Sequence, residues 1–392
     1  MMGTARSRPA RLRASGKPRV VLLADRRNWA FDVTARSLVA RLKREYRISI
    51  RYAQDDPDLS PDGYDLLYVF FWGEERYKPF MVPPEKLVKE VASYRWRDSE
   101  NFGRLSVSEF MGRYLGDCAV ITTPARAIYD LLAPAHEDVY LCPNGIEPSV
   151  FRPRTPRVGE LSVGWIGNPN DSLKGLNDVL LPSTRGVKFE ASPGDWSRSE
   201  VVGLYQRTDV LAVASISESQ PLPLIESMAC GCFPVATSVG VVPELVVSGL
   251  NGLVVNRDTE SFKAAFRWCA DNLDYVRRAG LRNASFVRAE RSWDKLAKRF
   301  GDVFDYAIAL QSDPTATPPV GVPPARRVRE AWEDAPATPA ALTLGDAIDG
   351  ARWRLGDRVR GLQARARDVR QRGRHVAGRI QSIVSERVTP SS

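Results

Sequence analysis

Two glutamates, Glu218 and Glu226, lie on either side of a proline-rich loop in the middle of the chain. Proline cannot sit inside a helix but suits a first helical turn, so Pro223 predicts a helix that begins near it and carries Glu226. The free N–H groups and the positive dipole end of such a helix favour anionic groups, phosphate above all. The segment therefore predicts a site for a polar, anionic ligand.

Two strands must position this site. Residues 209–215 are an apolar, valine-rich run of strand length that ends just before Glu218. A second strand at 233–237, a turn at Gly240 and a helix opened by Pro243 and Glu244 repeat the arrangement. Ligands of open α/β sheets bind at the carboxyl ends of the strands. We therefore expect both strand-to-helix turns to face one ligand.

The segment from Ser215 to Val255 resembles the retaining, nucleotide-sugar-dependent glycosyltransferases of the GT-B fold, in particular the family numbered four. Glu218 and Glu226 have that family's Glu-x7-Glu spacing, and a Gly-x-Pro-Val strand, a glycine turn, Pro-Glu and Asn-Gly-Leu follow in register. The resemblance implies an α/β protein of two Rossmann-like domains that face each other across a cleft. It also implies transfer of a sugar from a nucleoside-diphosphate sugar to a hydroxyl acceptor, with retention of anomeric configuration.

The same resemblance implies roles for single residues. Glu226 is expected at the ribose, Glu218 at the donor sugar, and Lys174, which follows the strand LSVGWIG, at the diphosphate. Departure of the nucleoside diphosphate is the difficult step, so stabilising it is most of the catalysis. A dipole-complementing Glu226, a solvated Glu218 and a surface Lys174 are the alternatives. The further residues expected to bind the donor are Gly167, Asn168, Gln220, Leu222, Gly240 and Glu244.

Two departures from the family pattern weaken the phosphate site. Asn168 stands where the family usually has arginine, and Pro221 removes an N–H that glycine would offer. Arg26 and Arg27, in the loop after the first strand, could supply the missing positive charge and are therefore included among the expected catalytic residues. An exposed arginine pair at the rim of the site is the other interpretation. Trp29, in the same loop, could stack on an acceptor sugar or simply cover the start of a helix.

Acid–base catalysis by histidine is not expected. The segment 89–100 corresponds to the place where many relatives have a histidine, but it offers Tyr94, Arg95 and Arg97, and we expect the two arginines at the acceptor. His136 and His375 are the only histidines of the chain. A front-face retaining mechanism tolerates this, because the leaving phosphate oxygen itself takes the proton of the acceptor.

Neither a metal nor another cofactor is expected. The Asp-x-Asp in the segment 55–58 lies in a proline-bearing polar turn, where acidic residues are common. The five cysteines lack zinc spacing and are expected to be buried, reduced thiols. Asn168, Pro221 and the missing histidine leave a second function open, a non-catalytic GT-B scaffold or sugar-nucleotide-binding module. An epimerase or phosphorylase of the same fold is disfavoured, since the acid–base groups or the pyridoxal lysine cannot be identified.

The length of 392 residues and the alternation of strands and helices predict two domains with additional segments. Five strands are identified in the first domain, in RVVLLAD, RISIRYA, DLLYVFFW, CAVITTP and DVYLCPNG. A closing helix at 292–310 is expected to cross back to the first domain. The expected divisions are a basic flexible arm (1–17), an N-terminal acceptor domain (18–147), a linker (148–157), a C-terminal donor domain with the closing helix (158–311), a proline-rich linker (312–345) and an arginine-rich helical tail (346–392).

The tail has both charge and pattern. The segment from Arg352 to Arg387 contains eleven arginines and three acidic residues, so it carries a net charge of +8 out of the chain's +9. Apolar residues at alternating steps of four and three from Leu355 to Ile383 form a heptad seam. Binding to an anionic membrane surface, self-association through a coiled coil, and a solvated tail all remain open. Nucleic-acid binding is not expected, because no motif accompanies the charge.

The expected partners are thus a nucleotide-sugar donor and a glycan, lipid-linked or protein acceptor. The basic N-terminal arm has no apolar h-region, and the longest apolar run is far short of the roughly 20 residues that a transmembrane helix needs. The expected location is the cytoplasm or, peripherally, the inner face of the membrane.

Overall fold

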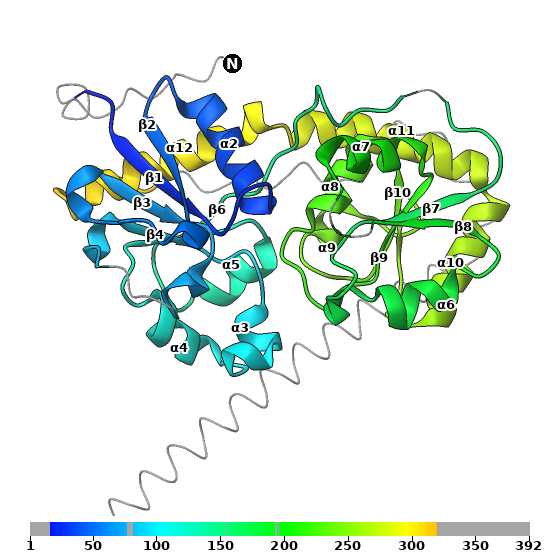
Figure 1. The fold of residues 1–392 in the computed structure, drawn as a ribbon, viewed down its shortest axis with the longest axis horizontal. Coiled ribbons are helices and arrows are strands. Elements are labelled where there is room, and N and C mark those ends of the chain that lie inside the picture. The colour runs from blue at the N-terminus through cyan, green and yellow to red at the C-terminus, as the bar shows by residue number, and fades with distance from the viewer. Residues whose placement is uncertain (1–15, 77–80, 155, 193, 195, 320–392) are drawn as a thin grey trace, which may run out of the picture. The chain divides into compact units, whose positions relative to one another are not determined.

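The structure is a computed structural model that describes residues 16–76, 81–154, 156–192, 194 and 196–319. The N-terminal arm before residue 16 and most of the proline-rich linker lie outside the described residues, as does the whole arginine-rich tail. The predictions for these segments therefore stay predictions. The described residues form two α/β domains, each built on a parallel sheet (Figure 1).

The first domain is built on a six-stranded parallel sheet with the order β2-β1-β3-β4-β5-β6. β1 and β3 are buried, mostly apolar runs, as expected where helices cover both faces of a parallel sheet, whereas the edge strand β2 is partly exposed. Their bounds are β1 Arg19–Ala24, β2 Arg47–Tyr52, β3 Leu66–Val69, β4 Leu87–Glu90, β5 Val120–Thr123 and β6 Val139–Leu141. All of these strands except β4 were expected from the sequence.

One face of this sheet is covered by α2 (Ala30–Leu42) and by the last helix, α12 (Trp293–Leu310). Phe300 and Phe304 of α12 pack against Tyr68 of β3, with ring centroids 6.0 and 5.7 Å apart. The expected closing helix therefore packs on the first domain, although it follows the second in sequence. The opposite face packs against an aromatic cluster beside the other helices, α3 (Arg95–Asp98), α4 (Val107–Phe110) and α5 (Arg126–Leu132).

The second domain contains a five-stranded parallel sheet with the order β11-β10-β9-β7-β8. Its strands are β7 Ser162–Trp165, β8 Lys188–Ala191, β9 Val210–Val213, β10 Phe233–Ala236 and β11 Leu253–Val254. Its helices are α6 Leu181–Ser183, α7 Arg198–Arg207, α8 Leu222–Ala229, α9 Val242–Leu245, α10 Thr259–Asp271 and α11 Leu273–Glu290. Two apolar clusters, one on each side of the sheet, form its core.

The chain passes between the domains twice, and the two passing segments are bonded to each other. Ile146 lies beside Ser292 in a parallel bridge, in which the Ile146 N–H donates to the Arg291 carbonyl over 2.7 Å and the Trp293 N–H donates to the Ile146 carbonyl over 3.1 Å. Gly145 is required here, since a Cβ at that position would lie 2.8 Å from the Trp293 nitrogen. The hinge between the domains is therefore a pair of bonded segments.

The order of the second sheet decides where a ligand can bind. β7 lies between β8 and β9, so the chain turns to opposite sides after β7 and β9, and the loops that follow them flank a topological switch point. These loops carry Lys174 and Glu218. In the part of the chain that the structure describes, no helix is both long and apolar enough to cross a membrane.

Candidate functional site

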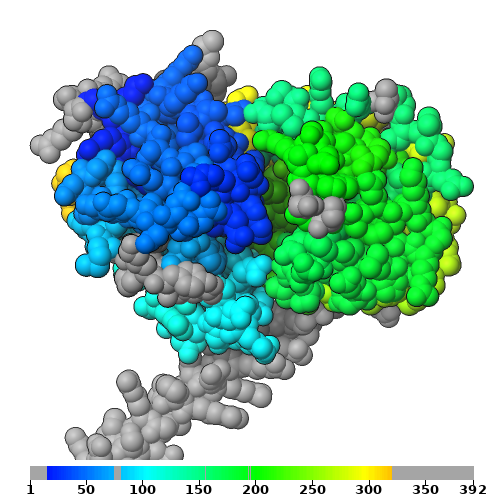
Figure 2. All heavy atoms as spheres, in the orientation of Figure 1, coloured from blue at the N-terminus to red at the C-terminus, as the bar shows by residue number. Residues whose placement is uncertain are grey.

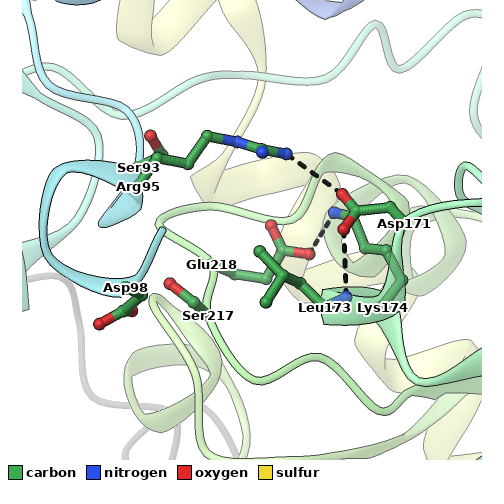
Figure 3. Close-up of a pocket in the computed structure, with 8 residues that line it drawn as sticks. All are labelled: Ser93, Arg95, Asp98, Asp171, Leu173, Lys174, Ser217 and Glu218. Atoms are coloured by element: carbon green, nitrogen blue, oxygen red, sulfur yellow. Dashed lines mark hydrogen bonds and ion pairs between the residues drawn. The ribbon is translucent and has the colours of Figure 1, made fainter. Parts of the chain in front are cut away.

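A small pocket lies where loops of the two domains meet (Figure 3). Its wall from the first domain comes from the segment after β4, and its wall from the second domain comes from the loops after β7 and β9. In Figure 2 the surface is hollowed between the blue part of the first domain and the green second domain. The lining residues are Ser93, Arg95, Asp98, Asp171, Leu173, Lys174, Ser217 and Glu218.

Lys174 and Glu218, which both line this pocket, form an ion pair. The Lys174 ammonium donates to Glu218 Oε1 over 2.5 Å, and the Ser215 hydroxyl donates to the same oxygen over 2.9 Å. The side chains are 28% and 15% exposed, so bulk water screens the pair only in part. The structure thus brings together the two residues that the sequence analysis expected at the phosphates and at the donor sugar.

The loop after β7 holds Lys174 in place through its backbone. Asp171 caps a short 3-10 turn, Ser172–Lys174, by accepting from the Leu173 N–H over 3.1 Å. Gly175 follows with a positive φ of 73°, and a Cβ there would lie 2.4 Å from the Ala214 carbonyl oxygen. Only glycine therefore allows this turn to approach the end of β9 so closely.

Arg95 connects the two walls of the pocket. Its guanidinium donates to Asp171 over 3.1 Å, and Figure 3 shows it reaching from the first domain toward the second. The Asp171 side chain is 16% exposed, whereas that of Arg95 is 46% exposed. Arg97, also expected at the acceptor, instead pairs with Asp98 over 2.8 Å and lies over the Tyr94 ring.

Glu226 lies in α8, one helical turn past its proline-containing start. The buried Tyr205 hydroxyl of α7 donates to Glu226 Oε2 over 3.1 Å. Burial raises the pKa of Glu226 to about 7, although the Tyr205 hydrogen bond and the charge of Arg198 act in the opposite direction. A partly buried carboxylate on this helix can accept hydrogen bonds from ligand hydroxyls, and it titrates near neutral pH.

The glycine turn after β10 packs directly on the loop that carries Glu218. Gly240 has a φ of 50°, and a Cβ there would lie 1.8 Å from the Ser219 carbonyl oxygen. The Val241 N–H donates to that oxygen over 2.8 Å. Gly240 therefore acts by holding two loops together.

Glu244 extends from α9 to the first domain and to the hinge. Its Oε1 accepts from the backbone N–H of Arg126, the first residue of α5, over 3.0 Å, and its Oε2 lies 3.7 Å from the Arg291 guanidinium. Burial raises the pKa of Glu244. The structure thus gives Glu244 protein partners at the domain boundary.

Of the residues expected to bind the donor, Glu226, Gly240 and Glu244 do not line the pocket, and neither do Gly167, Asn168, Gln220 and Leu222. Gly167 follows β7, where a Cβ would lie 2.6 Å from the Trp165 ring, and Asn168 accepts from the Asn170 N–H over 3.0 Å in an Asx turn. Leu222 begins α8 and packs partly against the apolar core. The Gln220 amide is bonded to the backbone of Asn144 in the hinge.

The arginines expected to replace the missing cation do not line the pocket. Arg27 donates twice to Asp55, over 2.9 and 2.6 Å, and lies over the Tyr52 ring. The Arg26 guanidinium stacks on Trp29, 4.1 Å from the ring centroid, and Trp29 itself is 50% exposed. Asp55, which directly precedes the Asp-x-Asp at residues 56–58, therefore has an arginine partner.

Several residues of the site were not identified from the sequence. Asp171 lies in a stretch that indicates only a turn, Ser215 ends a strand, and Tyr205 lies in a helix with no motif around it. Ser93 and Asp98 belong to the segment in which a histidine was sought. Among the described residues, no cluster of three or more His, Cys, Asp or Glu side chains could hold a metal ion.

The second domain is similar to a known family. Residues 163–272 match the model of the family described as Glycosyl transferases group 1. The chain is 24% identical over 260 residues to the MMP alpha-(1->4)-mannosyltransferase of Mycolicibacterium hassiacum, which covers 56% of this chain and 62% of that protein. It is 42% identical over 86 residues to the D-inositol 3-phosphate glycosyltransferase of Mycolicibacterium smegmatis, covering 22% of this chain and 19% of the relative. The chain thus spans less than two thirds of the length of either relative.

Solved structures show the same fold over most of the chain. A sucrose-phosphate synthase from Thermosynechococcus elongatus has a TM-score of 0.62 at 15% identity, covering 75% of this chain and all of that one. HepE of Anabaena, solved in complex with UDP-glucose, has a TM-score of 0.56 at 12% identity and covers 72% of this chain and 98% of that one. The fold is therefore GT-B, as predicted, and the chain resembles the family-4 glycosyltransferases through its second domain.

Proposed function

We propose that this protein transfers a sugar from a nucleoside-diphosphate sugar to a hydroxyl of an acceptor, with retention of anomeric configuration. The observation that carries the proposal is the Lys174–Glu218 pair at the switch point of the second sheet, inside the segment that matches the glycosyltransferase family. HepE, of the same fold, is described as a complex with UDP-glucose, which supports a donor of this chemical class. The nucleotide and the sugar stay open.

In this proposal the second domain holds the donor. Lys174, which lines the pocket, pairs with the diphosphate, where negative charge accumulates as the glycosidic bond to the leaving group breaks. Glu226 accepts hydrogen bonds from the ribose, and Glu218 accepts from a hydroxyl of the transferred sugar. When the donor binds, the Lys174–Glu218 pair is therefore replaced by a contact of Lys174 with the diphosphate and a contact of Glu218 with the sugar.

The acceptor approaches from the first domain. Ser93, Arg95 and Asp98 form that wall of the pocket, so hydrogen-bonding side chains line the pocket from both domains. His136 lies outside the pocket, in the turn before β6, where it accepts from the Asp138 N–H. The leaving phosphate oxygen is then the base that takes the acceptor's proton, which places the acceptor on the same face as the leaving group and gives retention.

The test is nucleoside-diphosphate release from a panel of donors that includes UDP-glucose, GDP-mannose and ADP-glucose. We expect one donor to be turned over, and Lys174→Met to lower kcat by about 10²- to 10³-fold, the usual effect of removing one preorganised electrostatic contact to a leaving group. Lys298→Met is the matched control, since Lys298 pairs with Asp302 on the surface of α12. Equal rates for Lys174→Met and Lys298→Met would refute the assignment of Lys174.

A non-catalytic GT-B module that binds a sugar nucleotide is the second candidate. It is favoured by the charge balance of the pocket, in which Lys174 pairs with Glu218 and Arg95 pairs with Asp171. Such pairing leaves less positive charge for a diphosphate. Saturable binding of a donor without any release of nucleoside diphosphate, even by hydrolysis, would support this candidate over the transferase.

A further inference from the structure

Gln220 is bonded to the hinge peptide by both ends of its amide. Its Oε1 accepts from the Asn144 N–H over 3.0 Å, and its Nε2 donates to the Asn144 carbonyl over 2.8 Å. The two residues are 8% and 7% exposed. A side-chain amide that pairs with both polar groups of one buried residue fixes their distance and their relative orientation, because neither group has water as an alternative partner.

The contact continues into the first domain. The Asn144 side chain accepts a 3.5 Å hydrogen bond from the hydroxyl of Thr34, a buried residue of α2. Two residues further along the chain, Ile146 forms the bridge with Ser292 that joins the two passing segments. Asn144 therefore belongs to the hinge and is bonded to a helix of the first domain.

Gln220 also belongs to the loop that carries the pocket glutamate. It is two residues beyond Glu218, and the intervening Ser219 is fixed by the Gly240 turn. Pro221 follows as the N-cap of α8, the helix that carries Glu226. A shift of the Gln220 backbone is thus transmitted to the glutamates on both sides of it.

We propose that Gln220 is a positioning residue that locks the Glu218 loop to the hinge, so that the donor site has its catalytic arrangement only when the hinge peptide is in place. This inference rests on the proposed transferase function. The Gln220 amide uses both of its ends on Asn144, so it acts through the loop and makes no direct contact with the donor. Removing it is expected to impair the chemical step more than donor binding.

The experiment compares full-length Gln220→Met with the wild type. Methionine keeps the length and volume of the side chain but cannot form either hydrogen bond. We expect kcat to fall by about ten- to a hundredfold while the dissociation constant of the donor changes by less than about threefold. Gln311→Met is the matched control, because Gln311 also donates to a backbone carbonyl, that of Asp65, away from the pocket. Its kcat should equal that of the wild type.

A second variant distinguishes positioning from mere stability. In Gln220→Glu, a protonated carboxyl group can reproduce both bonds to Asn144, whereas an ionised carboxylate places an acceptor oxygen against the Asn144 carbonyl. Well below the melting temperature, the ratio of its kcat to that of the wild type should therefore rise at least about fivefold between pH 8 and pH 6. A ratio that does not change with pH would overturn the proposal.

Hydrogen exchange at the Asn144 N–H provides a readout independent of turnover. Gln220→Met should exchange this amide at least about tenfold faster than the wild type. If no donor is turned over but this protection is lost in the variant, the proposed transferase function is wrong, whereas the role of Gln220 in holding the Glu218 loop to the hinge is supported. Unchanged protection would overturn the proposed role of Gln220. An unchanged kcat with a donor dissociation constant raised tenfold would also overturn it, and would instead indicate that Gln220 binds the donor directly.

Discussion

Glu226 gives a pH dependence that can be worked out from the structure. Burial raises the pKa of its carboxyl group from the ordinary 4.5 to about 7, so about nine tenths of the groups are ionised at pH 8 and about one tenth at pH 6. Ribose hydroxyls form stronger, charge-assisted hydrogen bonds with the ionised form. The affinity for a nucleotide sugar should therefore fall about tenfold from pH 8 to pH 6, equivalent to about 1.4 kcal/mol.

The assay is isothermal titration calorimetry with the donor that the panel identifies. A nucleotide sugar is a better probe than the free nucleoside diphosphate, because its diphosphate is esterified at both ends and does not titrate between pH 6 and pH 8. Glu226→Gln keeps the shape but not the charge, so its affinity should be lower by about ten- to a hundredfold at pH 8 and should not change with pH. Tyr205→Phe removes a hydrogen bond that lowers the Glu226 pKa, so its midpoint should move to higher pH.

Two results would refute this reasoning. One is a wild-type affinity that stays constant between pH 6 and pH 8. The other is a Glu226→Gln variant that keeps the pH dependence of the wild type, since the titrating group would then lie elsewhere. The melting temperature of each variant, measured at each pH, separates loss of binding from loss of folding.

Three further predictions concern stability. Burial raises the pKa of Glu90 to about 8, so the native state must hold a proton that the unfolded chain releases above about pH 4.5. In urea unfolding, the stability of Glu90→Gln relative to the wild type should therefore grow by about 1.4 kcal/mol per pH unit from pH 4.5 to pH 8 and then level off. A relative stability that does not grow with pH would contradict this prediction. Gly240→Ala places a Cβ 1.8 Å from the Ser219 carbonyl oxygen at a positive φ and should cost more than about 2 kcal/mol, whereas a melting temperature equal to that of the wild type would disprove the close approach. Asp55→Asn breaks an exposed, solvent-screened pair with Arg27 and should leave the free energy of unfolding close to that of the wild type in the same assay, where a clear loss would show a role beyond that pair.

The sequence predicted most of the fold because the strands are apolar runs bounded by turn residues. It failed at β4, where Lys89 and Glu90 stand in a four-residue strand and argue against a buried one. In the structure both side chains have polar partners. Lys89 donates to the Tyr114 carbonyl and to Asp117, and Glu90 accepts from Tyr68. Such partners come from distant segments, so a local pattern cannot reveal them.

The candidate site was predictable to the extent that local motifs specify it. Lys174 and Glu218 meet because the loops after β7 and β9 flank the switch point, which follows from the alternation of strands and helices and from the family pattern. The pairing of Arg27 with Asp55 and of Gln220 with Asn144 could not be predicted, because these partners are distant in sequence and meet only in the folded protein. Asn168 in place of the usual arginine suggested that Arg26 or Arg27 would supply a positive charge at the pocket. In the structure neither of them lines it.

The proposed transfer of a sugar with retention can be tested most directly by proton NMR of the anomeric signals during turnover. The full chain is incubated with an α-linked nucleotide sugar and a panel of hydroxyl acceptors, and the linkage of the first product is read before it can equilibrate. We predict an α-linked product that appears together with one equivalent of nucleoside diphosphate. A β-linked first product would contradict retention, and intact donor with every acceptor would contradict the transferase.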